Sequence, residues 1–307
     1  MADREGPPAF AFTVFTPTYN RAHTLAGVYR SLVAQTFRDF EWIIVDDGSN
    51  DGTEKLIAGW TPQADFPIRY IKQPNSGKHV AFNRAVREAK GELFLSFDSD
   101  DTCVPETLEK FWQHWRAIPE SERDRFSTLS VLCMTSTGAV IGKKYPQDVY
   151  DAHTFKEQFA VRDSERWGVN RTDILKTMPY EEFPGEKFIP EGCVWNRLSA
   201  QYSTRFVNEK LRIYEVGNDS LSTDTIGLRV RNPKGSCKYY AELSGYPLPF
   251  RERVKALINY ARFAFHGREP IGKVMERIKW FDKFLFSVAL PISFLIYKRD
   301  RIKLRRP

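Results

Sequence analysis

The chain has 307 residues, enough for one large domain or for a domain with an appendage. With 42% hydrophobic and 28% charged residues, its composition is typical of a globular protein. The four cysteines lie far apart and form no C-x-x-C pair, which argues against a zinc site or a disulfide scaffold and fits a reducing compartment. The first residues lack the basic-then-apolar order of a signal peptide, so we expect the chain to stay in the cytosol.

The net charge of +7 is concentrated at the C-terminal end. Residues 273–307 contain ten Lys and Arg and three Asp and Glu, whereas the other 272 residues contain 36 of each sign. A protein that binds nucleic acid usually carries its basic residues on the recognition surface of its fold. We therefore expect no nucleic-acid partner.

The first hundred residues alternate between short apolar runs and amphipathic stretches. The pattern predicts strands at residues 10–16, 41–45, 67–72 and 92–97, with helices at 25–33, 52–60 and 78–89 between them. Strands separated by helices indicate an α/β fold with a mostly parallel sheet covered on both faces. In such sheets, ligands bind beyond the carboxyl ends of the strands.

The rest of the chain is read more coarsely. We expect strands at 129–134, 139–142 and 212–216 and a helix at 194–202. From about residue 250 apolar residues recur at helical spacing with Lys and Arg between them, which predicts a helical region.

Two acidic loops follow predicted strands. Asp46-Asp47-Gly48-Ser49 can hydrogen-bond to a base or a ribose, but these residue types also suit a helix N-cap and a turn. Asp98-Ser99-Asp100-Asp101 is more specific, because three carboxylates in four residues repel one another. A divalent cation that bridges to a diphosphate would neutralise them, and Mg²⁺ usually binds through one or two carboxylates plus phosphate oxygens.

Two further segments are candidates. Asn75-Ser76-Gly77-Lys78-His79 resembles a loop that feeds a helix N-terminus, with donors for an anionic phosphate, although His79 can equally be an ordinary surface residue. Glu191 precedes the predicted helix at 194–202, where a carboxylate is also favoured by the helix dipole alone.

The order and spacing of several segments point to one family. These segments are FTPTYNR (15–21), SLVAQTF (31–37), WIIVDDGSNDGT (42–53), Asn75-x-Gly77, Asn83-Arg84-Ala85, and Gly91-Glu92 leading into Asp98-x-Asp100-Asp101. Together they resemble the start of family 2 glycosyltransferases. The resemblance is specific for about residues 10–110, looser to about 225, and absent from the tail.

The resemblance implies a GT-A fold, that of the nucleotide-diphospho-sugar transferases, and a nucleotide-sugar donor, most commonly a UDP-sugar. It implies that Tyr19 packs on the base and that Asp47 or Asp46 accepts hydrogen bonds from base and ribose. Asp98 and Asp100 fill the Asp-x-Asp motif, so Mn²⁺ or Mg²⁺ is expected at Asp100 together with Asp98. The expected donor-binding residues are Thr16, Pro17, Tyr19, Asn20, Arg21, Asp46, Asp47, Asn75, Gly77, Lys78, Asn83, Asp98, Ser99 and Asp100.

The expected catalytic base departs from the family pattern. The usual Glu-Asp pair before an aromatic residue is not present, and Glu191, four residues before Trp195, stands in the place of the catalytic Asp. The resemblance then implies that Glu191 takes a proton from the acceptor hydroxyl in a single inverting displacement, and that Trp195 contacts the acceptor. A processive synthase would carry a Q-x-x-R-W motif and several transmembrane helices, so we expect non-processive transfer.

The tail suggests a membrane surface. Residues 284–297 form a 14-residue apolar run bounded by Lys283 and by Lys298-Arg299. As a helix of about 21 Å, it is shorter than the roughly 30 Å hydrocarbon core, and Pro291 is expected to kink it. We expect an interfacial segment at the cytoplasmic face of a bacterial cell membrane and a polyprenyl-linked or other glycan acceptor. A helix packed on the domain, or a dimer contact, is the alternative.

We therefore expect a catalytic domain at 1–225 and a C-terminal helical, membrane-associating extension at 226–307. The catalytic domain would consist of a nucleotide-sugar half (1–110) and an acceptor half (111–225). A nucleotidyltransferase would show a Gly-rich basic loop after the first strand, and a Rossmann dehydrogenase would show G-x-G-x-x-G, but this chain has Thr16-Pro17-Thr18-Tyr19-Asn20. A non-catalytic sugar-nucleotide-binding or membrane-scaffold protein with the same fold stays open. The intact Asp-x-Asp argues against it, and the departure at Glu191 argues mildly for it.

Overall fold

The computed structural model describes residues 7–161, 165–214 and 224–304. The chain divides into two compact units, which are treated separately below. The sheet unit comprises Met1–Pro179 and Gln201–Gly217, and the helical unit comprises Tyr180–Ala200 and Asn218–Pro307. Residues 180–200 thus group with the C-terminal helices, although we expected them inside the acceptor half. The functional boundary at 225 stays a prediction.

The sheet unit is built on one mixed sheet. In the described residues its nine strands are β1 (Phe10–Thr18), β2 (Phe40–Asp46), β3 (Ile68–Lys72), β4 (Gly91–Ser96), β5 (Thr102–Cys103), β6 (Phe126–Met134), β7 (Val149–Ala152), β8 (Arg166–Arg171) and β9 (Ser203–Ile213). They lie in the order β3-β2-β1-β4-β8-β6-β9-β5, and β7 pairs with β9. The first four strands are parallel, whereas β8 is antiparallel to both β4 and β6. The expected mostly parallel sheet is therefore correct for the first hundred residues only.

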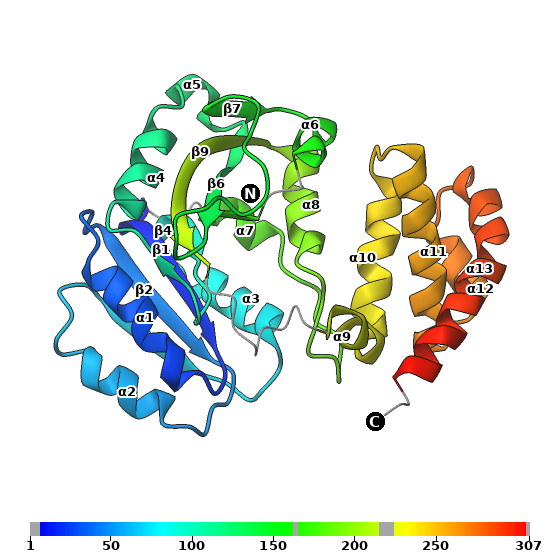
Figure 1. Cartoon of the computed structure of the whole chain (residues 1–307), viewed down its shortest axis with the longest axis horizontal. Helices are drawn as coiled ribbons and strands as arrows, with labels where there is room; N and C mark the ends of the chain where they lie inside the picture. The colour runs from blue at the N-terminus through cyan, green and yellow to red at the C-terminus, as the bar shows by residue number, and fades with distance from the viewer. Residues whose placement is uncertain (1–6, 162–164, 215–223, 305–307) are drawn as a thin grey trace. The chain divides into compact units, whose positions relative to one another are not determined.

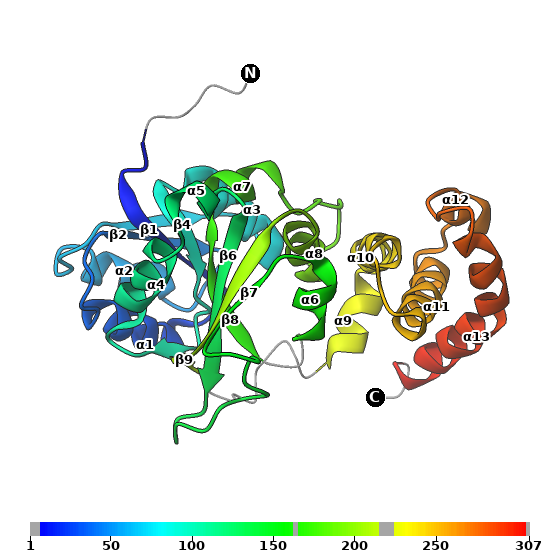
Figure 2. The ribbon, with the colours of Figure 1, turned by 90° about the horizontal axis from the view of Figure 1, so that it is seen from above.

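Helices cover both faces of this sheet (Figure 2). They are α1 (Ala22–Val33), α2 (Thr53–Trp60), α3 (Lys78–Glu88), α4 (Thr107–Arg116), α5 (Glu120–Arg123), α6 (Phe155–Ala160) and α7 (Thr172–Thr177). On one face, α1, α2 and α4 share a buried cluster with Phe12, Trp42 and other strand residues. On the other face, Phe82 of α3 meets Phe15 and Phe94 edge to face, with ring centroids 6.0 and 5.3 Å apart. Alternate side chains of a strand point to opposite faces, so these neighbouring strands can be buried on both.

The local predictions are mostly confirmed, with one clear error. The four strands and the helices expected in residues 10–97 are present within three residues of the expected bounds, and the helix expected at 194–202 is present within two. The strand expected at 139–142 is wrong: a turn at 135–138 leaves only an isolated bridge between Met134 and Val140. The strand expected at 212–216 begins much earlier, at Ser203, and residues 215 and 216 lie outside the described residues.

The helical unit has its own core. It comprises α8 (Gly192–Gln201, the last residue belonging to the sheet unit), α9 (Thr225–Arg231), α10 (Pro233–Gly245), α11 (Phe250–Gly267), α12 (Ile271–Glu276) and α13 (Asp282–Lys303). Helix α11 lies between α10 and α13 (Figure 1) and buries Leu257, Tyr260 and Phe263. Arg262 of α11 and Asp300 of α13 form a buried ion pair with N···O distances of 2.5 and 2.8 Å. Both a hydrophobic cluster and a paired charge thus join these helices.

Helix α13 contains the apolar run of the tail. Its 22 residues correspond to about 33 Å, and it continues through Pro291 as one helix. Among the helices that the structure describes, none is both long enough and apolar enough to cross a membrane.

Candidate functional site

Four loops meet at one edge of the sheet. The parallel strands β1, β2, β3 and β4 run in the same direction, and Thr18, Asp46 and Lys72 at three of their carboxyl ends are neighbours in register. The expected donor-binding residues lie at the carboxyl ends of these strands, in the loops that follow them, or in the helix after β3. The structure therefore brings them to the place where open α/β sheets bind ligands.

Asp47 joins two of these loops. Its Oδ1 accepts hydrogen bonds from the Gln73 side chain at 2.9 Å and from the Ser76 N–H at 2.8 Å, and its Oδ2 accepts from the Gly77 N–H at 2.8 Å. Gly48 adopts a φ of +90°, and a Cβ there would lie 3.1 Å from the Asn75 nitrogen. Asp47 and Gly48 together fix the loop that leads into α3.

Three of the expected donor-binding residues are deeply buried. Asp46 is inaccessible to solvent, and its oxygens accept from the Ser49 N–H at 2.7 Å and the Tyr70 hydroxyl at 2.6 Å. Thr16 is also inaccessible and accepts from the Trp42 indole at 3.0 Å, and Asn83 is 3% exposed. The contacts of Asp46 and Thr16 give these two residues structural roles, and Asp47 is also buried, at 6% exposure.

The end of β1 is accessible. Tyr19 is 49% exposed, which leaves its ring available for stacking. Asn20 has a φ of +53°, and it is held by the Ser49 hydroxyl on its N–H and by the Asn50 N–H on its side chain, at 2.8 and 2.9 Å. Pro17 is half-buried next to Tyr19. The chain therefore turns sharply after the strand and presents Tyr19 to solvent.

The acidic loop after β4 is surrounded by cations. Lys78 Nζ lies 2.8 Å from Asp98, and Arg21 lies 3.5 Å from Asp100. Arg212 of β9 forms an ion pair with the buried Asp101 and lies 3.8 Å from Asp98. Three positive side chains thus face three carboxylates.

These charges act on the protonation of the loop. Burial would raise the pKa of Asp98, but the positive charges of Lys78 and Arg212 hold it below its usual value. Burial raises the pKa of Asp101 to about 7 against the attraction of Arg212. Asp98 is therefore ionised at neutral pH and is the better metal ligand of these two.

The donor set fits a hard divalent cation. Asp98 and Asp100 have side chains that are 33% and 34% exposed, and both offer carboxylate oxygens. Mg²⁺ and Mn²⁺ prefer such ligands, and one or two carboxylates plus phosphate oxygens are enough for Mg²⁺. In the described ranges no group of three or more His, Cys, Asp or Glu side chains is placed to hold a metal ion.

Glu191 and Trp195 belong to the helical unit. Glu191 is exposed and immediately precedes α8, and its carbonyl accepts the N–H groups of Val194 and Trp195 at 3.1 and 3.3 Å. The Tyr180 hydroxyl also donates to this carbonyl, at 3.3 Å. Burial, followed by the nearby Glu191 charge, raises the pKa of Tyr180. The catalytic and acceptor-binding roles of Glu191 and Trp195 stay predictions.

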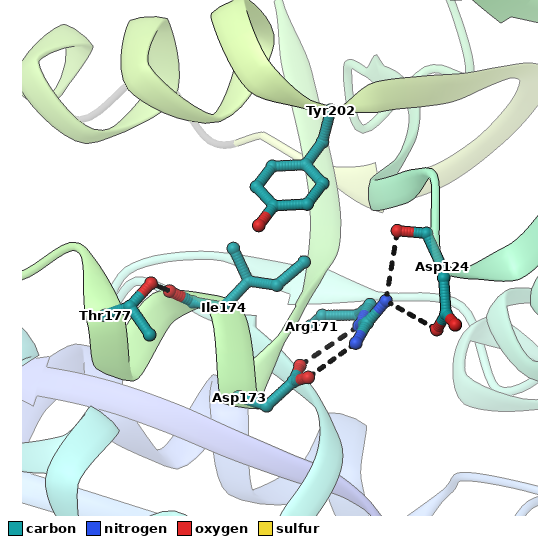
Figure 3. A pocket seen from close by; sticks show the side chains of 6 residues that line it. All are labelled: Asp124, Arg171, Asp173, Ile174, Thr177 and Tyr202. Atoms are coloured by element: carbon teal, nitrogen blue, oxygen red, sulfur yellow. Dashed lines mark hydrogen bonds and ion pairs between the residues drawn. The ribbon is translucent and has the colours of Figure 1, made fainter. Parts of the chain in front are cut away.

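A pocket of about 340 Å³ in the sheet unit is separate from these residues (Figure 3). It is lined by Asp124, Arg171, Asp173, Ile174, Thr177 and Tyr202. Arg171 is paired with Leu93, near the start of β4, so the pocket lies toward the opposite end of that strand from the acidic loop. Its guanidinium is already held by Asp173 at 2.5 Å and by Asp124 at 3.4 Å, which neutralises the charge an anionic ligand would need.

Sequence reasoning missed three residues that organise the site. Gln73 and Tyr70 bind the carboxylates of Asp47 and Asp46, and Arg212 binds Asp101. Tyr70 and Gln73 lie in and just after a predicted strand that ends at this edge, so their location could have been inferred. Arg212 follows Asp101 by more than a hundred residues, and no local pattern links the two.

The protein is thus an α/β protein whose candidate donor-binding residues lie at the carboxyl ends of parallel strands, where such sheets bind ligands. The family model described as glycosyl transferase family 2 matches residues 13–121. An uncharacterized glycosyltransferase of Nostoc sp. is 38% identical over 98 residues, which cover 32% of this chain and 30% of that protein. The matching segments span only 16% to 59% of the curated relatives' own lengths.

Two solved structures share the fold over almost the whole chain. Staphylococcus aureus TarS 1–349 in complex with UDP-GlcNAc has a TM-score of 0.57 at 17% identity and covers 92% of this chain and 80% of that one. The mannosyltransferase PcManGT of Pyrobaculum calidifontis, in complex with GDP-Man and Mn²⁺, has a TM-score of 0.53 at 16% identity, with coverage of 97% and 85%. The chain therefore has the GT-A fold of these structures, and its residues 13–121 match the family 2 glycosyltransferase model.

Proposed function

We propose that this protein is a non-processive, metal-dependent, inverting glycosyltransferase that moves one sugar from a nucleotide-diphosphate donor to a hydroxyl group. The observation that carries the proposal is the paired arrangement of Asp98 with Lys78 and Asp100 with Arg21 at the sheet edge. A metal-diphosphate brings both positive and negative charge, and this cluster offers partners for each. The family match and the nucleotide-sugar complexes of TarS and PcManGT support the reading.

The donor would bind along the edge of the sheet unit. Tyr19 would stack on the base. Asp47 and the loop between β3 and α3 that it holds would contact the nucleoside. Asp100 and Asp98 hold Mn²⁺ or Mg²⁺, which when bound stabilises the negative charge of the leaving nucleoside diphosphate. Arg21 and Lys78, which pair with Asp100 and Asp98 here, would bind phosphate oxygens of the donor when a cation neutralises these carboxylates.

Glu191 would act as the general base. Its exposed carboxylate at the start of α8 takes the proton of the acceptor hydroxyl while that oxygen attacks the anomeric carbon. The bond from the anomeric carbon to the diphosphate oxygen breaks as the new glycosidic bond forms, with inversion.

The acceptor would be lipid-linked, and the protein would rest on the cytoplasmic face of a bacterial membrane. Along α13, Phe284, Val288, Ile292 and Leu295 are all exposed and recur every three or four residues, so they form one stripe. Trp280, 82% exposed, lies just before the helix. The exposed basic residues Lys298, Arg299, Arg301 and Lys303 follow the stripe. This combination fits the interface of an anionic lipid surface.

Calorimetric binding of UDP, GDP and dTDP to the full chain, with and without Mn²⁺, tests the donor site. We expect metal-dependent binding of one nucleotide that is weakened at least about tenfold in Asp100→Ala, because a ligand of the metal is removed. A well-folded wild-type protein that binds none of the three would refute the proposal. Metal-independent binding unaffected by Asp100→Ala would refute its metal-diphosphate part.

A further inference from the structure

We propose that helix α10 is a positioning element for the catalytic base: it fixes the segment Tyr180–Ala200, and with it Glu191. The inference rests on the proposed function, because it takes Glu191 as the base. Helix α10 and the segment Tyr180–Ala200 both lie outside the family match at 13–121.

Ion pairs connect α10 to both ends of this segment. Glu242 of α10 receives two hydrogen bonds from the Arg197 guanidinium, at 2.7 and 3.1 Å, and both side chains are partly buried. Lys238, one turn earlier, lies 2.8 Å from Glu181 and 3.4 Å from Glu242. A bidentate Arg–carboxylate pair fixes orientation as well as distance.

The segment also caps the start of α10. The carboxylate of Glu186 accepts the N–H groups of Lys234 and Gly235 at 2.8 and 2.9 Å. Both N–H groups belong to the first turn of α10. The N–H groups of a first turn have no hydrogen-bond acceptor within their own helix, so the Glu186 carboxylate supplies one. The Asn232 side chain accepts the Lys187 N–H at 2.7 Å. These bonds fix the segment's middle to the amino end of α10.

Tyr239 of α10 packs against Gly192, the residue that follows Glu191. A Cβ added to Gly192 would lie 2.6 Å from the ring of Tyr239, so the aromatic side chain packs directly on the backbone that carries Glu191. Tyr239 lies between Lys238 and Glu242 on α10, and the ion pairs therefore hold its ring against Gly192. The start of α8 cannot move toward α10 without a clash.

These contacts set the position of the backbone from which the Glu191 side chain extends. A displacement of a reacting group by about 1 Å can lower a rate by about a hundredfold, whereas nucleotide binding by the sheet unit does not use α10. Loss of the contacts should therefore lower kcat and leave donor binding unchanged. A purely structural role would lower both together, through loss of folded protein.

The test compares Arg197→Glu, Glu242→Arg and the double exchange in the full chain. We expect each single variant to lower kcat at least about tenfold, with the calorimetric Kd for the nucleotide unchanged, and the double exchange to recover most of the loss. Arg277→Glu is the matched control, because it reverses the charge of the exposed Arg277, which pairs with the half-buried Glu269 in the same unit. We expect it to keep wild-type kcat.

Two further measurements keep the outcomes separate. Hydrogen exchange should speed up at the amides of Val194 and Trp195 in the single variants, because these amides bond to the Glu191 carbonyl. Gly192→Ala should lower kcat and regain part of it when combined with Tyr239→Ala, which removes the clash.

Two results would overturn the positioning role. One is wild-type kcat in the single variants. The other is a joint loss of kcat and nucleotide binding in the single variants that the double exchange does not recover. If Glu191→Gln retains wild-type kcat, the assignment of the base fails instead. That result is distinguishable, because it does not depend on any residue of α10.

Discussion

Asp47 and Gly77, 30 residues apart in the sequence, are joined by a 2.8 Å hydrogen bond from the Gly77 N–H to the Asp47 carboxylate. The same carboxylate accepts from Ser76 and Gln73, so one side chain fixes the whole loop between β3 and α3. Because the loop leads directly into Lys78, which pairs with Asp98, the two acidic loops are coupled through it.

Removal of this carboxylate should loosen the loop. We expect Asp47→Ala to lower stability by about 1–3 kcal/mol, because three buried or partly buried donors lose their acceptor. It should weaken nucleotide binding by about tenfold or more through the displaced loop. Thermal unfolding and calorimetry of the same preparation measure both. Unchanged nucleotide affinity in a destabilised protein would contradict the coupling of loop and donor site.

Arg212 and Asp101 form a buried pair whose disruption should be severe. Arg212→Met leaves the Asp101 carboxylate buried beside Asp98 without its partner, and we expect a loss of about 3–5 kcal/mol in unfolding free energy. The double variant Arg212→Met/Asp101→Leu should regain much of this loss, because no unpaired charge remains. Denaturant unfolding provides the values. Equal losses in the single and double variants would show that the pair's charge is not the cause.

The helical unit should lose stability in mild acid. His266 is packed beside Asp300 and Arg262, and burial lowers its pKa below the ordinary value of 6.5. The folded state therefore binds fewer protons than the unfolded state between the lowered pKa and 6.5, so stability falls as the pH drops through that window. Unfolding of the wild type and of His266→Gln between pH 7.5 and 5 checks this. The same pH dependence in both proteins would exclude His266 as its source.

The exposed stripe of α13 should bind anionic lipid. We expect full-length protein to sediment with phosphatidylglycerol vesicles more than with phosphatidylcholine vesicles, and Val288→Asp/Leu295→Asp to lose most of this binding. Phe250→Asp is the matched control, because Phe250 is 69% exposed on α11, outside the stripe. Binding that is unaffected by the double variant would contradict the proposed surface. A concentration-dependent dimer abolished by that variant, without vesicle binding, would assign the stripe to a second copy instead.

The sequence predicted the sheet edge well, because the signals there are local. Apolar runs ending in Asp46 and before Asp98 mark strands and their carboxyl ends, and the helices between them follow from spacing. Antiparallel β8 and the long strand β9 were harder to predict. In β9, for example, Arg205 and Arg212 are buried beside partners far away in the sequence, Asp151 and Asp101, which neutralise them.

Residues 180–200 show the same limit. Helix α8 could be predicted from its spacing, but its assignment to the C-terminal helices depends on pairs such as Arg197–Glu242, 45 residues apart. A lone Glu or Arg in a sequence does not identify its partner. The sequence therefore indicated Glu191 by resemblance and gave no sign of the α10 residues packed around its segment.

The most direct test of the central claim is release of nucleoside diphosphate from a panel of UDP-, GDP- and dTDP-sugars by purified full-length protein with Mn²⁺. We predict release from at least one donor, stimulated by a lipid extract that contains glycan acceptors. We expect the rate to fall by about a hundredfold or more in Asp100→Ala and in Glu191→Gln, which lack a metal ligand and the base. No release by a wild-type protein that binds the nucleotide would contradict the account and favour a non-catalytic sugar-nucleotide-binding protein.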